Sequence, residues 1–246
     1  MKEIKGIVEK NIEIAPQYYL LEIKGDFPPS VPGQFAMLSP SSSFDPFLRR
    51  PFGIADQGEG WAKFIYKVVG RGTTILSTLK PGDNVSLISP LGKGFDPIKE
   101  NSLLIAGGTG IAPILYLAKK LSKFVLLYGA KTEKEILKKL VEEFVIGKGE
   151  VIFVTEDGSL GKKGLLTQHI PSGEFEMAYV AGPYQMMKKF SRLYKGKALF
   201  SMETRMGCGF GVCYSCVVKV RKNGKEKYVR SCVEGPVFKG EEIIWI

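Results

Sequence analysis

Alternating apolar and polar residues, broken by proline and glycine turns, characterise the chain up to about residue 97. Alternation with a period of two residues is typical of strands that bury one face. The turn sequences FPPSVPG and KPGDN supply residues that preset or tolerate turn geometry. Short strands joined by such turns predict a small β-barrel. The expected strands are residues 6–14, 18–25, 33–39, 52–56, 62–70 and 83–89.

The pattern changes near Asn101, where strands that are apolar throughout begin to alternate with helical segments. Apolar runs without polar alternation are typical of strands buried on both faces. Their alternation with helices predicts an α/β domain, a parallel sheet covered by helices on both sides. The expected strands are residues 102–107, 124–130, 150–156, 177–183 and 197–202.

One helix of this second part has a predicted start. Thr132 is followed three residues later by Glu135, the spacing of a capping box that opens a helix. The apolar residues that follow repeat at helical spacing, which predicts a helix with one face packed on the sheet. These residues are Ile136, Leu137, Leu140, Val141 and Phe144.

The last part of the chain, from about Glu203, is short and rich in cysteine and glycine. It ends in two alternating segments around Asn223–Gly224, and Asn-Gly is a strong signal for a tight hairpin turn. The 246-residue chain is therefore expected to contain three domains. They are a β-barrel over residues 1–97, a parallel-sheet α/β domain over 98–202 and a small domain over 203–246.

The charge balance is basic, with 35 Lys and Arg against 25 Asp and Glu. Because acidic residues interleave with the basic ones, we favour a solvated basic surface over a nucleic-acid groove; such a surface also suits an acidic protein partner. Residues 101–118 carry no charge over 18 residues, but their glycines and proline fit a strand, loop and helix better than a membrane span. The N-terminus lacks the apolar core of a signal peptide. We therefore expect a cytoplasmic protein that binds neither nucleic acid nor membrane.

A glycine loop joins an apolar strand to a helix in the segment LLIAGGTGIAPILYLAKKL. Its spacing, Gly108-x-Gly110-x-x-Pro113, differs from the dinucleotide fingerprint because proline takes the last place. Glycines let a phosphate approach the backbone, and the helix N-terminus offers free N–H groups. Proline fits the first helical turn, where no N–H is needed. The loop alone fits either a nucleotide site or a tight turn between strand and helix.

All four cysteines of the chain lie in its last part, with the spacing C-x4-C-x2-C-x15-C. Without a signal peptide, such cysteines are better explained as metal ligands than as disulfides. The first three have the spacing of plant-type ferredoxin clusters, which favours a 2Fe–2S cluster; structural zinc and free thiols remain alternatives. Gly207, Gly209 and Gly211 would let the loop wrap closely around a cluster. The expected ligands are Cys208, Cys213, Cys216 and Cys232.

Five motifs follow one another along the first 200 residues, namely PGQF, RRPFGIA, YKVVGRGT, GGTGIAP and AGPYQMM. In this order they resemble the ferredoxin reductase family, in which a flavin-binding barrel precedes a pyridine-nucleotide domain. The resemblance implies that Arg50 binds the FAD pyrophosphate, with Pro51, Phe52 and Gly53 along the isoalloxazine ring. Gly53 stands where the family has Ser or Thr, so a side-chain hydroxyl contact to the flavin is lost at this position.

The same resemblance implies further contacts to both nucleotides. Ile65, Tyr66 and Lys67 would lie along the FAD, and Gly72 and Thr73 would offer backbone N–H groups to its phosphates. The glycine loop described above would bind NAD as a substrate. The family often has Cys-Gly-Pro near the nicotinamide, whereas this chain has Ala-Gly-Pro at residues 181–183 and hence no thiol there.

Two acidic residues bear on the choice between NAD and NADP. Glu156 and Asp157 come just after the third strand of the predicted sheet. Acidic groups at this place repel a 2′-phosphate, and no cluster of arginines stands ready to receive one. The sequence therefore favours NAD.

The segment SMETRMGCGFGVCYSCVVKV, joined after a flavin and nucleotide module, is similar to the electron-transfer subunits of the two-subunit, NAD-linked dihydroorotate dehydrogenases. This resemblance implies FAD, a 2Fe–2S cluster and NAD in one relay of pyrimidine biosynthesis. Electrons would pass from an FMN-containing catalytic subunit, which oxidises dihydroorotate, to the cluster, then to FAD and finally to NAD⁺. It also implies a heterotetramer with two copies of each subunit.

Two other interpretations stay open at the level of sequence. The nearer one is the NAD(P)H–flavin–iron–sulfur subunit of another oxidoreductase, such as a sulfide dehydrogenase, a hydrogenase or a ferredoxin-dependent transhydrogenase. The more distant one is a binding module that zinc stabilises and that acts through its basic surface.

Overall fold

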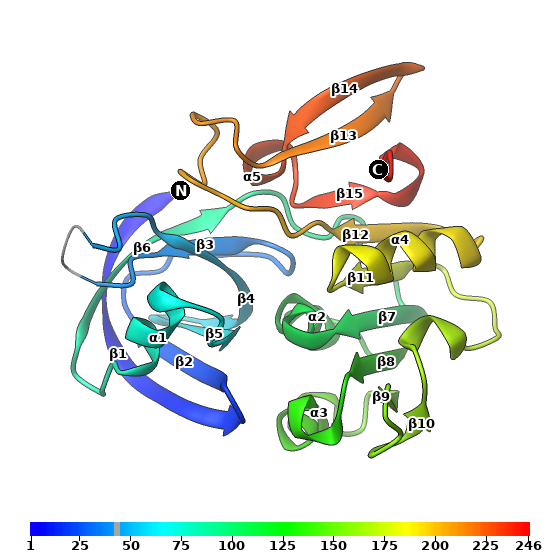
Figure 1. The fold of residues 1–246 in the computed structure, drawn as a ribbon, viewed down its shortest axis with the longest axis horizontal. Helices are drawn as coiled ribbons and strands as arrows, with labels where there is room; N and C mark the ends of the chain where they lie inside the picture. The colour runs from blue at the N-terminus through cyan, green and yellow to red at the C-terminus, as the bar shows by residue number, and fades with distance from the viewer. Residues whose placement is uncertain (42–44) are drawn as a thin grey trace.

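The computed structural model describes residues 1–41 and 45–246. A barrel formed by the N-terminal residues stands beside a sheet with helices on its two faces (Figure 1). A hairpin from the C-terminal part, β13 and β14, lies above the sheet in this view (Figure 1). None of the helices within these described residues is long and apolar enough to cross a membrane.

Six strands close into an antiparallel barrel in the order β1-β2-β5-β4-β3-β6. The sequence pattern predicted all six. Strand β6 shows the alternation clearly, with exposed or half-buried residues between buried ones, whereas all four residues of β3 are buried. Helix α1 (Arg71–Ser77) packs its buried Leu76 against the barrel core. The strands are β1 (Lys2–Ala15), β2 (Tyr18–Lys24), β3 (Phe35–Leu38), β4 (Arg50–Gly58), β5 (Trp61–Lys67) and β6 (Asn84–Leu91).

The second part forms a seven-stranded sheet in the order β10-β9-β8-β7-β11-β12-β15. The five predicted strands are confirmed, and they pair in parallel. The two-residue edge strand β10 joins them in parallel, whereas β15 pairs antiparallel with β12. The strands are β7 (Ser102–Gly107), β8 (Phe124–Ala130), β9 (Gly149–Thr155), β10 (Lys162–Lys163), β11 (Ala178–Ala181), β12 (Ala198–Ser201) and β15 (Val237–Lys239).

Helices cover both faces of this sheet, as the buried strands predicted. Helices α2 (Ile111–Ala118) and α3 (Lys138–Val145) share one hydrophobic core with barrel side chains such as Leu20 and Ile65. Helix α4 (Tyr184–Leu193) packs on the opposite face together with the C-terminal hairpin. The barrel therefore shares the apolar core on the α2–α3 side of the sheet.

The expectation that Thr132 opens a helix is wrong. Thr132 makes no side-chain capping bond, and residues 133–135 form a single 3₁₀ turn, η2 (Glu133–Glu135); the α-helix begins only at Lys138. The Glu135 carboxylate, which a capping box would turn back to Thr132, pairs instead with Lys67 of the barrel at 2.9 Å. The apolar residues of this segment pack against the core as predicted, two of them ahead of the helix.

The C-terminal part consists of a hairpin, a short helix and the strand that joins the sheet. The hairpin pairs β13 (Val217–Lys222) with β14 (Lys225–Arg230), and both turn residues have positive φ, 53° and 75°, as an Asn-Gly turn of type I′ requires. Helix α5 (Ser231–Glu234) leads into β15, and the short turns η1 (Gly108–Gly110), η3 (Leu166–Gln168) and η4 (Gly240–Glu242) complete the elements. The strand β15 ties this part to the sheet, which the sequence pattern did not predict.

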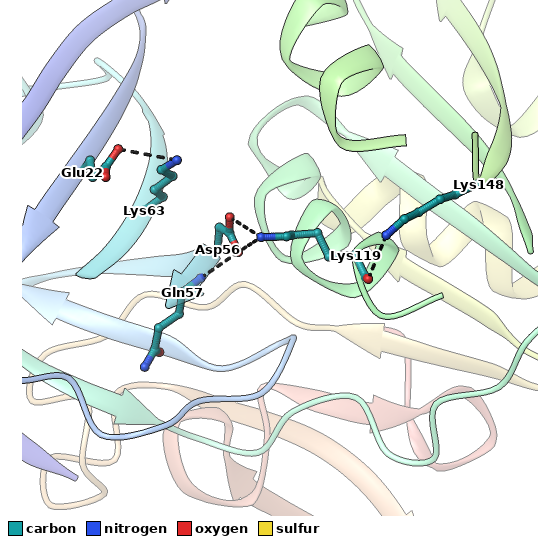
Figure 2. Close-up of polar contacts among 6 residues, drawn as sticks. All are labelled: Glu22, Asp56, Gln57, Lys63, Lys119 and Lys148. Atoms are coloured by element: carbon teal, nitrogen blue, oxygen red, sulfur yellow. Dashed lines mark hydrogen bonds and ion pairs between the residues drawn. The ribbon is translucent and has the colours of Figure 1, made fainter. Parts of the chain in front are cut away.

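An ion pair fastens the barrel to the sheet at the end of α2 (Figure 2). Lys119 donates to both carboxylate oxygens of Asp56, at 2.8 and 2.7 Å, and the Asp56 carboxylate also accepts the Gln57 N–H at 2.9 Å. The Asp56 side chain is only 5% exposed, whereas that of Lys119 is 41% exposed. Nearby, Tyr116 of α2 donates to the Ser30 carbonyl at 2.9 Å. These contacts fix the angle at which the two parts meet.

Candidate functional site

A first cavity of about 300 Å³, here called the barrel cavity, lies between β4, β5, helix α2 and the segment that follows β12. Eight of the nine barrel residues expected from the sequence to contact FAD line it, and Gly72 does not. The cavity is framed by the open ends of strands from two domains, a common place for a cofactor. The eight residues are Arg50, Pro51, Phe52, Gly53, Ile65, Tyr66, Lys67 and Thr73.

Gly72 acts by making room. A Cβ atom at this position would lie 2.4 Å from Nε of Arg50 and 2.8 Å from its Cζ. The guanidinium group therefore rests against the backbone of the first turn of α1, and a larger residue at this position would displace it. Gly72 and Thr73 stand in this first turn, where backbone N–H groups lack intrahelical partners. Arg50 and the first turn of α1, through Thr73, thus line the same cavity.

Aromatic side chains form one wall of the barrel cavity. Tyr66 is buried, stacks on Tyr19 with ring centroids 5.4 Å apart and donates its hydroxyl to Oδ1 of Asn11 at 3.0 Å. Burial raises the pKa of the Tyr66 hydroxyl, so it stays protonated at neutral pH. Phe52 lies 5.6 Å from Tyr66, centroid to centroid. The wall is apolar and rigid, which suits a flat aromatic ligand.

A second cavity of about 670 Å³, here called the nucleotide cavity, opens at the carboxyl ends of β7, β8, β9 and β11. In open α/β sheets this edge is where ligands bind. Of the three glycine-loop residues expected to bind NAD, only Gly108 lines it. Gly110 packs against the sheet instead, since a Cβ there would lie 2.4 Å from the Ala181 carbonyl oxygen. Pro113 lines the barrel cavity.

The barrel also supplies residues to the nucleotide cavity, which the sequence patterns did not reveal. Tyr18 and Lys67 line it, and Lys67 pairs with Glu135 at 2.9 Å while lying 4.9 Å from the centre of the Tyr18 ring. The hydrogen bond to Glu135 raises the pKa of Lys67, so its charge is firmly held. Glu156, one of the two acidic residues expected near the ribose, lines the cavity. Asp157 does not, and accepts bonds from Ser159.

The two cavities adjoin. Four residues line both of them, namely Lys67, Val69, Thr109 and Glu203. Glu203 follows β12, and its side chain is exposed where the two cavities meet; its carboxyl nevertheless lies deep within the molecule, and this desolvation raises its pKa. Sequence reasoning placed no function on Glu203, because its proximity to both cavities arises only when β12 is added to the sheet.

The four cysteine thiols are free and lie at the base of the hairpin. Cys216 and Cys232 are buried against barrel residues that include Phe35 and Met37, and Cys213 is exposed. Backbone N–H groups point at sulfur: Cys208 N–H to Cys213 Sγ and Val212 N–H to Cys208 Sγ, both at 3.4 Å. Such N–H groups stabilise the negative charge of thiolates.

The environments of the thiols differ strongly. Hydrogen bonds from Ser215 lower the pKa of Cys213 to about 6, and burial raises the pKa of Cys232 to about 12. Neighbouring Cys216 and Cys208 contribute to the rise at Cys232, so these thiols interact. Within residues 1–41 and 45–246, no three His, Cys, Asp or Glu side chains already stand at metal-ligand spacing. The four-thiol donor set and the N–H groups aimed at sulfur fit an iron–sulfur cluster.

Glycines shape the cysteine loop, as the sequence indicated. Gly209 has φ +83° and leaves no room for a side chain, since its Cβ would lie 2.4 Å from Cγ of Met37. Gly211 has φ +94° and its carbonyl accepts a bond from Arg230 at 2.9 Å. Arg230 was not expected; its guanidinium lies 4.9 Å from the Tyr214 ring and pairs with Glu234, and so clamps the loop to α5.

The cysteine loop and the barrel cavity share a wall. Phe35 packs with Cys216 and Cys232 and also lines the barrel cavity. Met206, two residues ahead of the first cysteine, does the same. The barrel cavity therefore adjoins both the nucleotide cavity and the cysteine loop.

Two family profiles match the chain. The profile described as the iron–sulfur cluster binding domain of dihydroorotate dehydrogenase B matches residues 203–244, and that of the oxidoreductase NAD-binding domain matches residues 104–192. The first covers the cysteine loop and the second covers the sheet strands that frame the nucleotide cavity.

Relatives named as the electron-transfer subunit of NAD⁺-dependent dihydroorotate dehydrogenase B are similar over nearly the whole chain. The one from Clostridium acetobutylicum is 40% identical, with 99% of each chain covered. The one from Caldanaerobacter subterraneus is 39% identical over 99% of each chain, and the one from Desulforamulus reducens is 38% identical over 94% of each.

Among solved structures, the NADH-dependent reduced ferredoxin–NADP oxidoreductase described for flavin-based electron bifurcation has a TM-score of 0.84. It is 29% identical, and the match covers 98% of this chain and 90% of that one. The ferredoxin reductase of carbazole 1,9a-dioxygenase has a TM-score of 0.66 at 22% identity, covering 78% of this chain and 64% of that one. The latter likeness concerns the fold alone.

Proposed function

This chain belongs to the family of electron-transfer subunits of NAD⁺-dependent dihydroorotate dehydrogenase B, and from this premise we propose how its own residues carry the electrons. The partner in that family is a catalytic subunit. The observation that carries the proposal is the position of the barrel cavity, which shares four lining residues with the nucleotide cavity and a wall with the cysteine loop. A flavin in the barrel cavity would stand between NAD and an iron–sulfur cluster.

FAD, when bound, exchanges hydride with nicotinamide and single electrons with an iron–sulfur cluster. Arg50 would hold its pyrophosphate, with Gly72 leaving room for the guanidinium. Phe52 and Tyr66 would pack on the flavin ring. The apolar wall that they form would exclude water from the site of hydride transfer.

Glu156 supports NAD over NADP as the nucleotide. Its carboxylate lines the nucleotide cavity and would repel a 2′-phosphate. We expect Glu156→Gln to raise the ratio of catalytic efficiency with NADPH to that with NADH several-fold in a dye-reduction assay, because one repulsive charge is removed. The control is Glu59→Gln, at an exposed glutamate that does not line this cavity. An unchanged ratio in Glu156→Gln would exclude this carboxylate as the discriminating group.

All four cysteines serve as cluster ligands in this proposal, within a domain of residues 203–246 that follows a FAD domain over 1–97 and an NAD domain over 98–202. Cys213 lies at the exposed side of the loop, and Cys232 at its buried side. The free thiols suit the reducing cytoplasm, which is the location that we propose.

The partner would carry FMN and dock at the cysteine loop, in a complex with two copies of each subunit. Apolar side chains stand out from this loop: Phe210 is 43% exposed, Tyr214 61% and Val212 73%. Exposed apolar groups around a redox centre favour a protein partner there, because its binding would remove them from water.

Reconstitution with an FMN-containing catalytic subunit tests the proposal. Alone, the chain should transfer electrons from NADH to a dye and leave dihydroorotate untouched; the pair should reduce NAD⁺ with dihydroorotate. Cys232→Ser should lose the coupled reaction and iron while it keeps FAD and dye reduction. If the chain alone oxidises dihydroorotate, or if it binds and serves only a ferredoxin, the proposal is wrong.

A further inference from the structure

The flavin motif of this chain lacks a hydroxyl at Gly53, and the structure shows that a side chain at this position would be crowded. A Cβ atom on Gly53 would lie 3.2 Å from Cδ of Pro113, which is tighter than ordinary contact. Pro113 is buried in the first turn of α2, where the fixed ring leaves little freedom to yield. The wall of the barrel cavity at Gly53 therefore offers no side-chain hydrogen bond.

A threonine whose hydroxyl is buried without a partner lies elsewhere on the wall of the same cavity. Among the described residues, three buried side-chain atoms lack a hydrogen-bond partner: Nη1 of Arg49, Oγ of Ser89 and Oγ1 of Thr204. Of these residues only Thr204 lines the barrel cavity. An unsatisfied buried hydroxyl costs roughly 1–3 kcal/mol, so its presence in a folded protein calls for an explanation.

Four other residues with hydroxyl groups line this cavity, and the hydroxyls of two of them, Thr73 and Tyr66, bond to protein partners; the other two are Thr109 and Ser201. Thr73 donates to the Gly70 carbonyl at 2.9 Å and accepts from the Val69 N–H at 2.9 Å. Tyr66 donates to Asn11. Thr204 differs from all four because its Oγ1 is buried without a partner, and a turn about χ1 would bring this hydroxyl from its buried position toward the cavity without moving the backbone.

We propose that Thr204 supplies the side-chain hydrogen bond to the flavin that Gly53 cannot supply. It reaches the cavity from the segment between β12 and the cysteine loop, whereas Gly53 lies on β4 of the barrel. The segment that leads to the cluster ligands thereby takes part in holding the flavin. This inference rests on the proposed function, in that the barrel cavity holds FAD.

The test compares Thr204→Val with Thr204→Ser in the full chain. Valine keeps the shape and removes the hydroxyl, and serine keeps the hydroxyl. We expect Thr204→Val to bind FAD roughly three- to tenfold more weakly, by titration of the FAD-free chain, and to shift the absorption bands of the bound flavin. Thr204→Ser should behave like the parent protein, as should the control Thr132→Val, whose hydroxyl makes no capping bond.

A second measurement separates this role from a structural one. Because Thr204 Oγ1 has no partner within the protein, the FAD-free Thr204→Val chain should unfold in urea at the same concentration as the parent or a higher one. A lower midpoint of the FAD-free variant, or FAD affinity and flavin spectrum equal to those of the parent, would overturn the inference. Failure of the proposed function would be distinguishable, since the parent chain itself would then not bind FAD.

Discussion

At the scale of the residue, Glu203 shows how one side chain acquires a role from its surroundings. It lines both cavities, and desolvation raises the pKa of its carboxyl. In the folded chain it therefore binds a proton more readily than in the unfolded chain, whose carboxyl has the ordinary pKa of 4.5. As the pH rises above 4.5, the unfolded chain loses this proton before the folded chain does. The free energy of unfolding of the FAD-free protein therefore falls until Glu203 is ionised in the folded chain as well, and it stays lower at higher pH.

Replacing Glu203 by glutamine removes this ionisation. We expect Glu203→Gln to gain stability over the parent at pH 8 and to gain less at pH 5, because part of the parent population is already protonated at the lower pH. Urea unfolding of the FAD-free chain at the two pH values measures both differences, with Glu59→Gln on an exposed turn as the control. If Glu203→Gln gains more stability at pH 5 than at pH 8, the pKa of Glu203 is not raised in the folded chain and the explanation is wrong.

Residues that act through a local motif were predictable, and residues that act through long-range packing were not. Arg50 and Phe52 stand in a short motif, and the cysteines in a spacing that a cluster requires. Thr204 and Tyr18 reach the cavities only because β12 enters the sheet and β2 enters the barrel, so no short window of sequence contains their partners.

At the scale of the element, alternation and apolar runs predicted the six barrel strands and the five parallel strands of the sheet. They failed where tertiary contacts overrode a local signal: Glu135 pairs with Lys67 instead of capping a helix at Thr132. They also missed β15, whose three residues are recruited to the sheet edge by pairing with β12. In the cysteine loop, the glycines singled out from the sequence meet direct steric limits, as at Gly209 beside Met37.

Comparing two glycines with similar φ angles distinguishes the effect of backbone strain from that of a steric clash. Gly209 and Gly224 have φ of +83° and +75°, but a Cβ clashes only at Gly209, where Met37 Cγ would lie 2.4 Å away. Gly224→Ala should cost about 1 kcal/mol and keep its full iron content. Gly209→Ala should lose most of its iron, measured per chain after anaerobic preparation, since the loop must leave the barrel. Equal iron content in both variants would contradict this account of the loop.

At the scale of the whole molecule, the two cavities exist only because the barrel and the sheet meet at a fixed angle. The Asp56–Lys119 ion pair crosses this interface (Figure 2). Unlike the carboxylates of exposed ion pairs, that of Asp56 is only 5% exposed. Lys63 and Glu22, also drawn in Figure 2, pair within the barrel and do not bear on the interface.

Replacing Lys119 should lower the stability of the protein more than replacing Asp56. Lys119→Met leaves a buried carboxylate without its cation and should destabilise the protein by about 2–4 kcal/mol. Asp56→Asn leaves a lysine that reaches water and should cost roughly 1–2 kcal/mol. The control Lys138→Met removes an exposed pair with Glu142, 3.9 Å apart, and should cost less than about 0.5 kcal/mol. Urea unfolding measures the loss of stability in all three variants. If Lys119→Met loses no more stability than Lys138→Met, the Asp56–Lys119 pair does not stabilise the interface.

The order of cavities predicts the order of electron transfer, and anaerobic mixing of the chain with NADH tests it most directly. Flavin absorbance and the electron paramagnetic resonance signal of the reduced cluster are followed in the same samples. The account predicts that the flavin is reduced first and the cluster afterwards, that the FAD-free chain leaves its cluster oxidised, and that Cys213→Ser still reduces its flavin. A cluster that NADH reduces as fast without FAD as with it would contradict the relay through the barrel cavity.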